Sequence, residues 1–153
     1  MSFCSKKRGG SVRLFLALLV AFPIMTSCAT GTINVAGTTP ESELATITAA
    51  HRFYLFADYD CGITQASGTS LGSHAGAKTA RVPEGLIDLS LRCAFVIPYY
   101  GGHVYSGEVN FLAQAGHEYT VLFENTRKCI VVVDEGSDAK VAEDCALSSY
   151  FLP

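Results

Sequence analysis

The sequence comprises 153 residues, 49% of them hydrophobic and 16% charged, and carries a net charge of −3 from 11 Lys+Arg and 14 Asp+Glu. A chain of this length has room for one domain with a hydrophobic core, but not for two. Four of the basic residues precede residue 28 and all of the acidic ones follow it, so residues 28–153 have a net charge of −7. A domain this acidic repels phosphate backbones and anionic membrane surfaces, and we therefore expect no nucleic-acid partner.

The first 27 residues have the pattern of a secretory signal peptide. Residues 1–13 contain four basic side chains and no acidic one, and residues 14–25 (LFLALLVAFPIM) are apolar. A basic segment followed by an apolar stretch of this length is typical of export signals. A membrane-spanning helix needs about twenty apolar residues, so an uncleaved anchor is the less favoured interpretation.

Residues 25–28 (MTSC) resemble the lipobox of bacterial lipoproteins, in which an apolar residue and two small ones precede a cysteine. The resemblance implies that Cys28 is acylated and becomes the mature N-terminus. Acyl chains contribute about 0.8 kcal/mol per buried CH₂, so the product would stay on a membrane. Ala29, at a position where aspartate favours retention in the inner membrane, implies the periplasmic side of the outer membrane. Cleavage after Ala29 by ordinary signal peptidase is the alternative, and it would release a soluble protein.

The cysteine count predicts two disulfide bonds. Cys4 leaves with the signal peptide and Cys28 is either lipidated or removed, which leaves four cysteines in an exported chain: Cys61, Cys93, Cys129 and Cys145. An even number in an oxidising compartment is typical of a disulfide framework. We favour Cys61–Cys93 and Cys129–Cys145, because each pair joins segments that a meander of strands would place side by side. Structural zinc is not favoured, because its cysteine ligands usually lie two to four residues apart.

Residues 28–43 form the first segment after the cleavage site. They are small and polar and include Gly and Pro, which predicts a flexible tether, although residues 32–35 could pair weakly as an edge strand. The remainder, residues 44–153, is predicted to form a single domain.

Strand and loop signals alternate from residue 44 onward. The aromatic run at residues 53–56 predicts a buried strand. Residues 61–78 are rich in Gly, Ser and Thr and are predicted to be mostly loop, with one short strand at residues 62–66. A proline and a glycine at residues 81–85 indicate a turn. Residues 86–97 alternate apolar and polar, which predicts a strand with one buried face.

The next segment, residues 98–107, contains three tyrosines and three glycines and is predicted to be an exposed hairpin loop. Residues 109–115 and 119–124 read as two strands with a tight turn between them, and we expect them to form a hairpin.

Residues 129–134 (CIVVVD) give the strongest strand signal, because β-branched side chains favour extended backbone. Residues 136–144 are polar and are expected to hold a turn of helix. About six to eight short strands, with no long helical period after the signal peptide, predict an all-β fold. An antiparallel β-sandwich or a small barrel fits this pattern.

Two motifs add a family resemblance. Residues 82–89 (VPEGLIDL) resemble a proline-glycine turn that opens an alternating strand, and residues 115–121 (AGHEYTV) resemble a turn followed by Tyr-x-apolar. This order is similar to small bacterial lipoproteins that carry a PEGA-like or transthyretin-like β-sandwich. This sequence departs from the family pattern at one point, because Glu84 separates the proline and the glycine that are adjacent in the family. The resemblance covers about residues 44–134 and implies a non-enzymatic envelope module.

No motif of catalysis or cofactor binding is present: neither G-x-S-x-G, nor H-E-x-x-H, nor a phosphate-binding glycine loop. We therefore expect no enzyme activity, no cofactor and no metal. His117 is interpreted as a turn residue and His51 as the start of a strand. Asp58 and Asp60 could ligate calcium, but a solvated turn is the favoured interpretation.

The residues most suggestive of binding lie in the predicted loop at 98–107. Tyrosine offers rigid amphipathic contact area, so four side chains there could form a recognition patch: Tyr99, Tyr100, His103 and Tyr105. The alternative is that some of these rings fold back and cap the core.

Three functional hypotheses follow. The first is a lipid-anchored, non-enzymatic accessory whose partners are the membrane, through its lipid, and another envelope protein or component. The second is a ligand- or carbohydrate-binding module that uses the tyrosine loop. The third is an envelope hydrolase whose site is assembled from distant residues, since catalytic triads are spatial.

Overall fold

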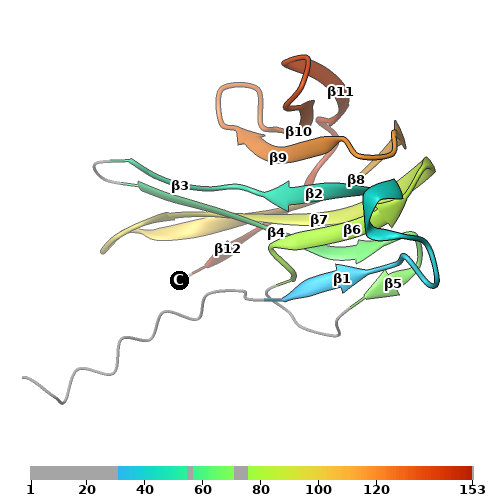
Figure 1. Ribbon diagram of the computed structural model, residues 1–153. Coiled ribbons are helices and arrows are strands. Elements are labelled where there is room, and N and C mark those ends of the chain that lie inside the picture. The colour runs from blue at the N-terminus through green and yellow to red at the C-terminus, as the bar shows by residue number, and fades with distance from the viewer. Residues whose placement is uncertain (1–30, 55–56, 71–75, 153) are drawn as a thin grey trace, which may run out of the picture.

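The computed structural model describes residues 31–54, 57–70 and 76–152, which form twelve β-strands and one short 3₁₀ turn, η1 (Glu41–Glu43) (Figure 1). One sheet contains, in spatial order, β1 (Thr32–Asn34), β6 (Thr79–Pro83), β2 (Leu44–Ala49), β9 (Glu118–Glu124), β10 (Cys129–Asp134) and β11 (Ala139–Asp144). The other contains β12 (Ser148–Leu152), β8 (Gly101–Ala113), β7 (Gly85–Ile97), β4 (Ala57–Ala66) and β3 (His51–Tyr54), with β5 (Thr69–Ser70) paired to β4. We refer to these as the first and second sheets.

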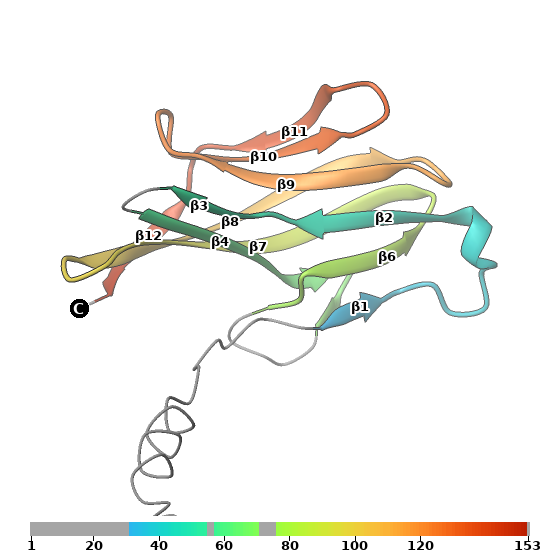
Figure 2. The same ribbon diagram turned by 60° about the vertical axis from the view of Figure 1, so that its left-hand side comes forward.

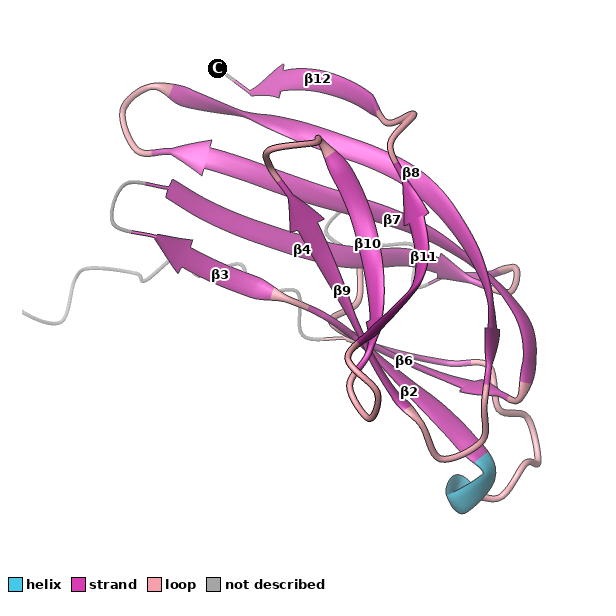
Figure 3. Cartoon of the chain, turned by 90° about the horizontal axis from the view of Figure 1, so that it is seen from above, coloured by secondary structure: helices cyan, strands magenta, loops and turns pink. Residues whose placement is uncertain are grey.

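Figures 1 and 3 show strands of one sheet lying over strands of the other. Side chains from both sheets form one hydrophobic core between them. In β7 the predicted alternation holds, because Ile87, Leu89 and Leu91 are buried in the core while Leu86 is 72% exposed. Inward residues of the first sheet, such as Ile47 and Val132, close the core from the other side. The all-β fold with two sheets is therefore confirmed. The prediction that it is antiparallel throughout is wrong, because β1 pairs in parallel with β6 and β2 pairs in parallel with β9 in the first sheet. The described residues also contain more strands than the six to eight expected.

Ala50 is the point where the chain passes from one sheet to the other. Its N–H donates to the carbonyl of Val121 in β9, whereas its carbonyl accepts the N–H of Cys61 in β4. β2 therefore belongs to the first sheet and β3, one residue later, to the second. Strands that switch sheets in this way make the corners of strongly bent β-sandwiches.

A second switch lies at residues 83–85, where a turn was predicted. Pro83 pairs with Leu44 in the first sheet, while Gly85 pairs with Ala113 in the second. Gly85 has a φ of +136°, a backbone conformation that side chains with a Cβ rarely adopt. The turn signal thus marks a corner between the sheets, and β7 begins there.

The predicted hairpin of residues 109–115 and 119–124 is wrong. β8 pairs with β7 and β12, and β9 pairs with β10 and β2, so the connection between them crosses from one sheet to the other. The turn itself is present at residues 115–116, but its backbone bonds to β2: Gly116 N–H donates to Leu44, and Thr46 N–H donates to His117. Because β2 lies beside β9, it takes the position that β8 would have taken.

Two predicted non-strand segments are mostly extended. The predicted loop at 98–107 is a short turn followed by the first half of β8, and the segment at 136–144 contains β11 rather than helix. Each of these strands pairs with the strand that precedes it, β8 with β7 and β11 with β10, although glycine and polar residues give no strand signal of their own. The short strand predicted at residues 62–66 is confirmed as the second half of β4, and β5 follows it; residues 71–75 of the predicted loop lie outside the described part of the chain.

The tether prediction fails for residues 32–43. β1 pairs in parallel with β6, and Ile33 is 1% exposed within the core. The Asn34 side chain accepts the N–H of Ala36 at 3.0 Å, and the following residues lead through η1 into β2. The alternative considered for residues 32–35, an edge strand, is confirmed by β1, which lies at the edge of the first sheet. Residues 28–30 lie outside the described part of the chain.

Both disulfide bonds form with the pairing that the sequence favoured. Cys61 and Cys93 are direct register partners in β4 and β7, and both are buried in the core. Cys129 begins β10, and Cys145 follows β11 at a sequence separation of 16. The Cys61 N–H bonds to Ala50 rather than to β7, which makes Cys61 and Cys93 a non-hydrogen-bonded pair with closely spaced side chains.

We expect both bonds to contribute strongly to stability. In the chain-entropy description, loops of 32 and 16 residues correspond to about 4 and about 3 kcal/mol. A Cys61→Ala/Cys93→Ala double variant should therefore lose more unfolding free energy in urea than Cys129→Ala/Cys145→Ala. A parent-like denaturation midpoint for the first variant, or two free thiols in the unreduced parent, would contradict this expectation.

Candidate functional site: an aromatic cleft between the sheets

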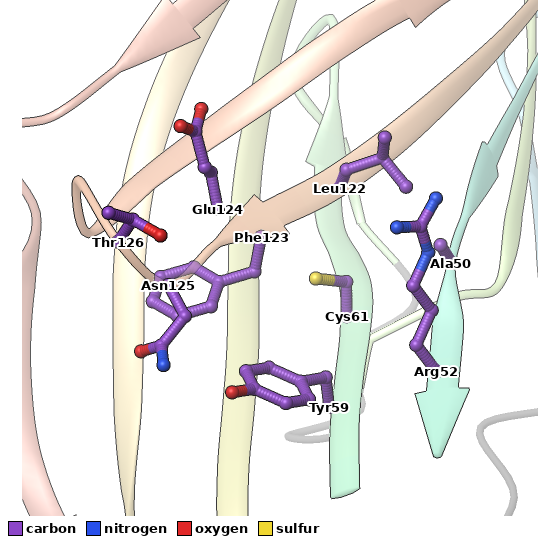
Figure 4. Close-up of a pocket in the computed structure, with 9 residues that line it drawn as sticks. All are labelled: Ala50, Arg52, Tyr59, Cys61, Leu122, Phe123, Glu124, Asn125 and Thr126. Atoms are coloured by element: carbon purple, nitrogen blue, oxygen red, sulfur yellow. The ribbon is translucent and has the colours of Figure 1, made fainter. Parts of the chain in front are cut away.

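A cleft of about 330 Å³ opens where β3 and β9 diverge (Figure 4). β2 and β9 remain paired only as far as Ala49 and Val121, because the chain then crosses to the second sheet. One wall comes from β3, the floor from β4, and the other wall from the end of β9 and the turn after it. The lining residues are Ala50, Arg52, Tyr59, Cys61, Leu122, Phe123, Glu124, Asn125 and Thr126.

Four half-buried rings, which we call the aromatic cluster, extend the core at this end of the molecule: Tyr59, Phe95, Tyr105 and Phe123. The centroid of Tyr59 lies 4.7 Å from that of Phe95 and 6.2 Å from that of Phe123, and Phe123 stacks on Tyr105 at 4.7 Å. Pairs at these distances stabilise beyond their buried area. Two members of the cluster, Tyr59 and Phe123, line the cleft itself.

The turn between β9 and β10 forms the rim of the cleft. Lys128 adopts a left-handed backbone conformation, with φ at 56°, and its ammonium group donates to the side chain of Asn125. The same group lies 5.7 Å from the ring centre of Tyr105 and 5.9 Å from that of Phe95. A cation over aromatic faces is attracted to them, so Lys128 fixes the turn against the cluster.

Glu124 is held ionised at the same rim. Arg127 donates to both of its carboxylate oxygens, at 2.9 and 2.6 Å, and this pairing lowers the pKa of Glu124. Arg127 also reaches Glu143 at 2.9 Å, and the pKa of Glu143 is lowered by Lys140 and Arg127. The negative charges beside the cleft are therefore already matched by cations.

Arg52 differs from the other basic residues. All seven basic residues after position 28 fall within the described ranges, and within those ranges Arg52 alone has no recorded hydrogen bond, ion pair or ring contact. Its side chain is exposed and forms part of the cleft wall (Figure 4). The cleft thus combines aromatic rings, hydrogen-bonding side chains and one cation without a partner in the described part of the chain.

The predicted tyrosine patch is divided by the structure. Tyr99 and Tyr100 lie fully exposed in the turn at the tip of the β7–β8 hairpin. Tyr105 belongs to the aromatic cluster, and His103, on the same face of β8, lies 6.1 Å from it and 5.3 Å from Phe151. The expectation that some rings fold back onto the core therefore holds for Tyr105.

Two histidines of the described residues, His51 and His117, form pairs with carboxylates. His51 Nε2 lies 2.6 Å from Asp58, and His117 Nδ1 lies 2.9 Å from Asp134. Among the described residues no serine, threonine or cysteine side chain is recorded in a hydrogen bond with either ring. Asp60 pairs with Lys78, so the two acids at 58 and 60 are strand residues with cationic or histidine partners rather than a solvated turn.

One group of potential metal ligands occurs in the described residues: Cys129, Glu143 and Cys145 lie within 4.8 Å of one another. Both sulfurs are already joined to each other in a disulfide bond. A thiolate is the form that binds zinc, and this group offers none while the bond is intact.

Sequence reasoning missed Arg52, Asn125 and Phe123 as site residues. Phe123 was expected only as part of a strand, and a single arginine or asparagine carries no motif. Their common position depends on the divergence of β3 and β9, which follows from the switch at Ala50. The sequence has no local signal for that divergence.

No protein-family model, curated protein or solved structure matches this chain. The signal peptide, Cys28 and Ala29 lie outside the described residues. Within the described part, no helix has the length and apolar character needed to span a membrane.

The Asp134–His117 pair predicts a pH dependence of stability. His117, and then the N–H of Gly136 at 2.8 Å, hold the pKa of Asp134 below its ordinary value of 3.8, although burial opposes them. A carboxyl whose pKa is lower in the folded state stabilises the fold at pH values above its unfolded-state pKa. This contribution is lost as the pH falls through the folded-state pKa. Asp134→Asn should be less stable than the parent at pH 7, and the difference should narrow below pH 3.8. Urea denaturation across that range tests this, and a constant difference would contradict it.

Proposed function

We propose that this chain is an exported, lipid-anchored β-sandwich that binds a component of the bacterial cell envelope without catalysing a reaction. Two disulfide bonds support export, because such bonds persist in oxidising compartments. The basic and apolar segments of residues 1–25 and the lipobox-like residues 25–28 support an anchor at Cys28.

The observation that carries a binding role is the cleft beside the aromatic cluster. Binding sites are concave and combine apolar walls with a few polar groups that fix orientation. Here Tyr59 and Phe123 supply the apolar walls, and Arg52 and Asn125 supply polar groups. The cleft, rather than the tip that bears Tyr99 and Tyr100, is therefore our proposed binding site.

We also propose that the domain is of the PEGA-like or transthyretin-like kind. Its two-sheet architecture and the corner at residues 83–85 that opens β7 support this assignment. The histidine–carboxylate pairs, which have no recorded hydroxyl or thiol partner among the described residues, favour binding over hydrolysis.

The anchor predicts incorporation of lipid at one residue. Cells supplied with a palmitate analogue should label the parent protein, and Cys28→Ser should lose all label. Ala29 predicts that the labelled parent fractionates with the outer membrane. Labelling that persists in the Cys28→Ser variant, or an unlabelled parent, would contradict the anchor.

The binding site predicts position-dependent crosslinking. A photoreactive amino acid at Asn125, on the rim of the cleft, should form an adduct with an envelope component in intact cells. The same amino acid at Leu86, which is exposed on the outer face of β7, is the matched control and should not. Equal adducts from both positions, or none from Asn125, would refute the cleft as the binding site.

A further inference from the structure

We infer that the cleft binds a carboxylate-bearing sugar residue of an envelope glycan, an inference that rests on the cleft being the binding site proposed above. The argument begins with Arg52, whose guanidinium lies on the cleft wall with no recorded partner in the described residues. A guanidinium is a planar fork that matches a carboxylate with two parallel hydrogen bonds.

The surrounding charges favour a ligand group with a single negative charge. Residues 28–153 are acidic overall, with a net charge of −7, so a doubly charged phosphate would be repelled by the domain and would meet only one available arginine. Glu124, the acidic residue of the cleft lining, is paired with Arg127, so its charge opposes a carboxylate at Arg52 less than an unpaired acid would. One guanidinium and one carboxylate balance each other.

The remaining lining fits a sugar ring. A pyranose presents C–H groups on its faces and hydroxyl groups around its edge. Tyr59 and Phe123 offer half-buried rings for the C–H faces, and the side chains of Asn125 and Thr126 offer donors and acceptors for the hydroxyls. Figure 4 shows these groups around one opening, with Arg52 on the opposite wall from Asn125 and Thr126. A site of about 330 Å³ lies at the small end of ligand pockets, so it fits a short segment of glycan.

The cleft is also held in shape before a ligand arrives. Its floor residue Cys61 is bonded to Cys93 and is 2% exposed. Its rim is fixed by Lys128, which contacts Asn125 and two rings of the aromatic cluster. A preformed site loses less conformational entropy on binding, which matters for a ligand as small and polar as a sugar.

The test compares matched probes on the full-length protein purified in detergent. A disaccharide containing a hexuronic acid and its neutral hexose counterpart differ only in the carboxylate, and N-acetylmuramic acid serves as a second acidic probe. Titration calorimetry should give an affinity for the acidic probes about tenfold or more above that for the neutral one. Arg52→Gln should remove this preference. The control variant is Arg81→Gln, which removes an arginine of β6 that is paired with Glu41, and it should keep the preference. Tyr59→Leu should weaken the acidic and neutral probes alike.

Three results would overturn the inference. Equal affinity for acidic and neutral probes, or an unchanged preference for the acidic probes in Arg52→Gln, would exclude recognition of a carboxylate by Arg52. Tighter binding of carboxylate-ended peptides than of any sugar probe would exclude the glycan. If no probe binds while the Asn125 position still crosslinks an envelope component, the glycan inference fails and the proposed function stands; loss of that crosslink would instead remove the proposed function.

Discussion

The two hydrogen bonds of Ala50 are the constraint on which the shape of this molecule depends. Its N–H bonds to β9 in one sheet, and its carbonyl bonds to β4 in the other. Because one residue bonds to both sheets, the chain leaves β9 at the end of β2 and continues as β3 beside β4. β9 extends beyond this point without β2 as a neighbour. The cleft is the space that results. The cleft that we propose as the binding site is thus a consequence of how the chain closes its core, because backbone groups near a buried corner need partners.

The second crossing, at residues 83–85, complements the first. β6 lies beside β2 in the first sheet, and β7 lies beside β4 in the second, so here too the chain passes from the first sheet to the second within a few residues. The two crossings tie the sheets together at their corners, whereas the β7–β8 hairpin extends past the core toward the turn at residues 98–100. Figure 2 shows this hairpin extending beyond the ends of β9 and β10. The aromatic cluster includes one ring from each strand of the hairpin, Phe95 and Tyr105.

The sequence predicted the elements that have a strong local pattern, and it failed where the pairing partner of a segment decides its structure. Alternation in residues 86–97 and the β-branched run in residues 129–134 identified β7 and β10, and the cysteine count identified both disulfides. The same reasoning placed β8 and β9 in one hairpin, because a turn between two strands looks alike whether it joins neighbours or crosses between sheets. It also assigned glycine-rich residues to loops, although their partners in the sheets extend them. The cleft could not be predicted because its walls come from strands that are far apart in sequence.

Both disulfide bonds lie close to the cleft as well as stabilising the fold. Cys61 forms part of the cleft floor, and Cys129 directly follows the turn that carries Asn125 and Lys128. One bond therefore holds β4 to β7 beneath the aromatic cluster, and the other ties the start of β10 to the segment between β11 and β12. A small domain buries limited apolar surface and gains stability from covalent links. Because one bond lies at the floor of the cleft and the other follows the turn at its rim, the two bonds constrain the cleft and the fold together.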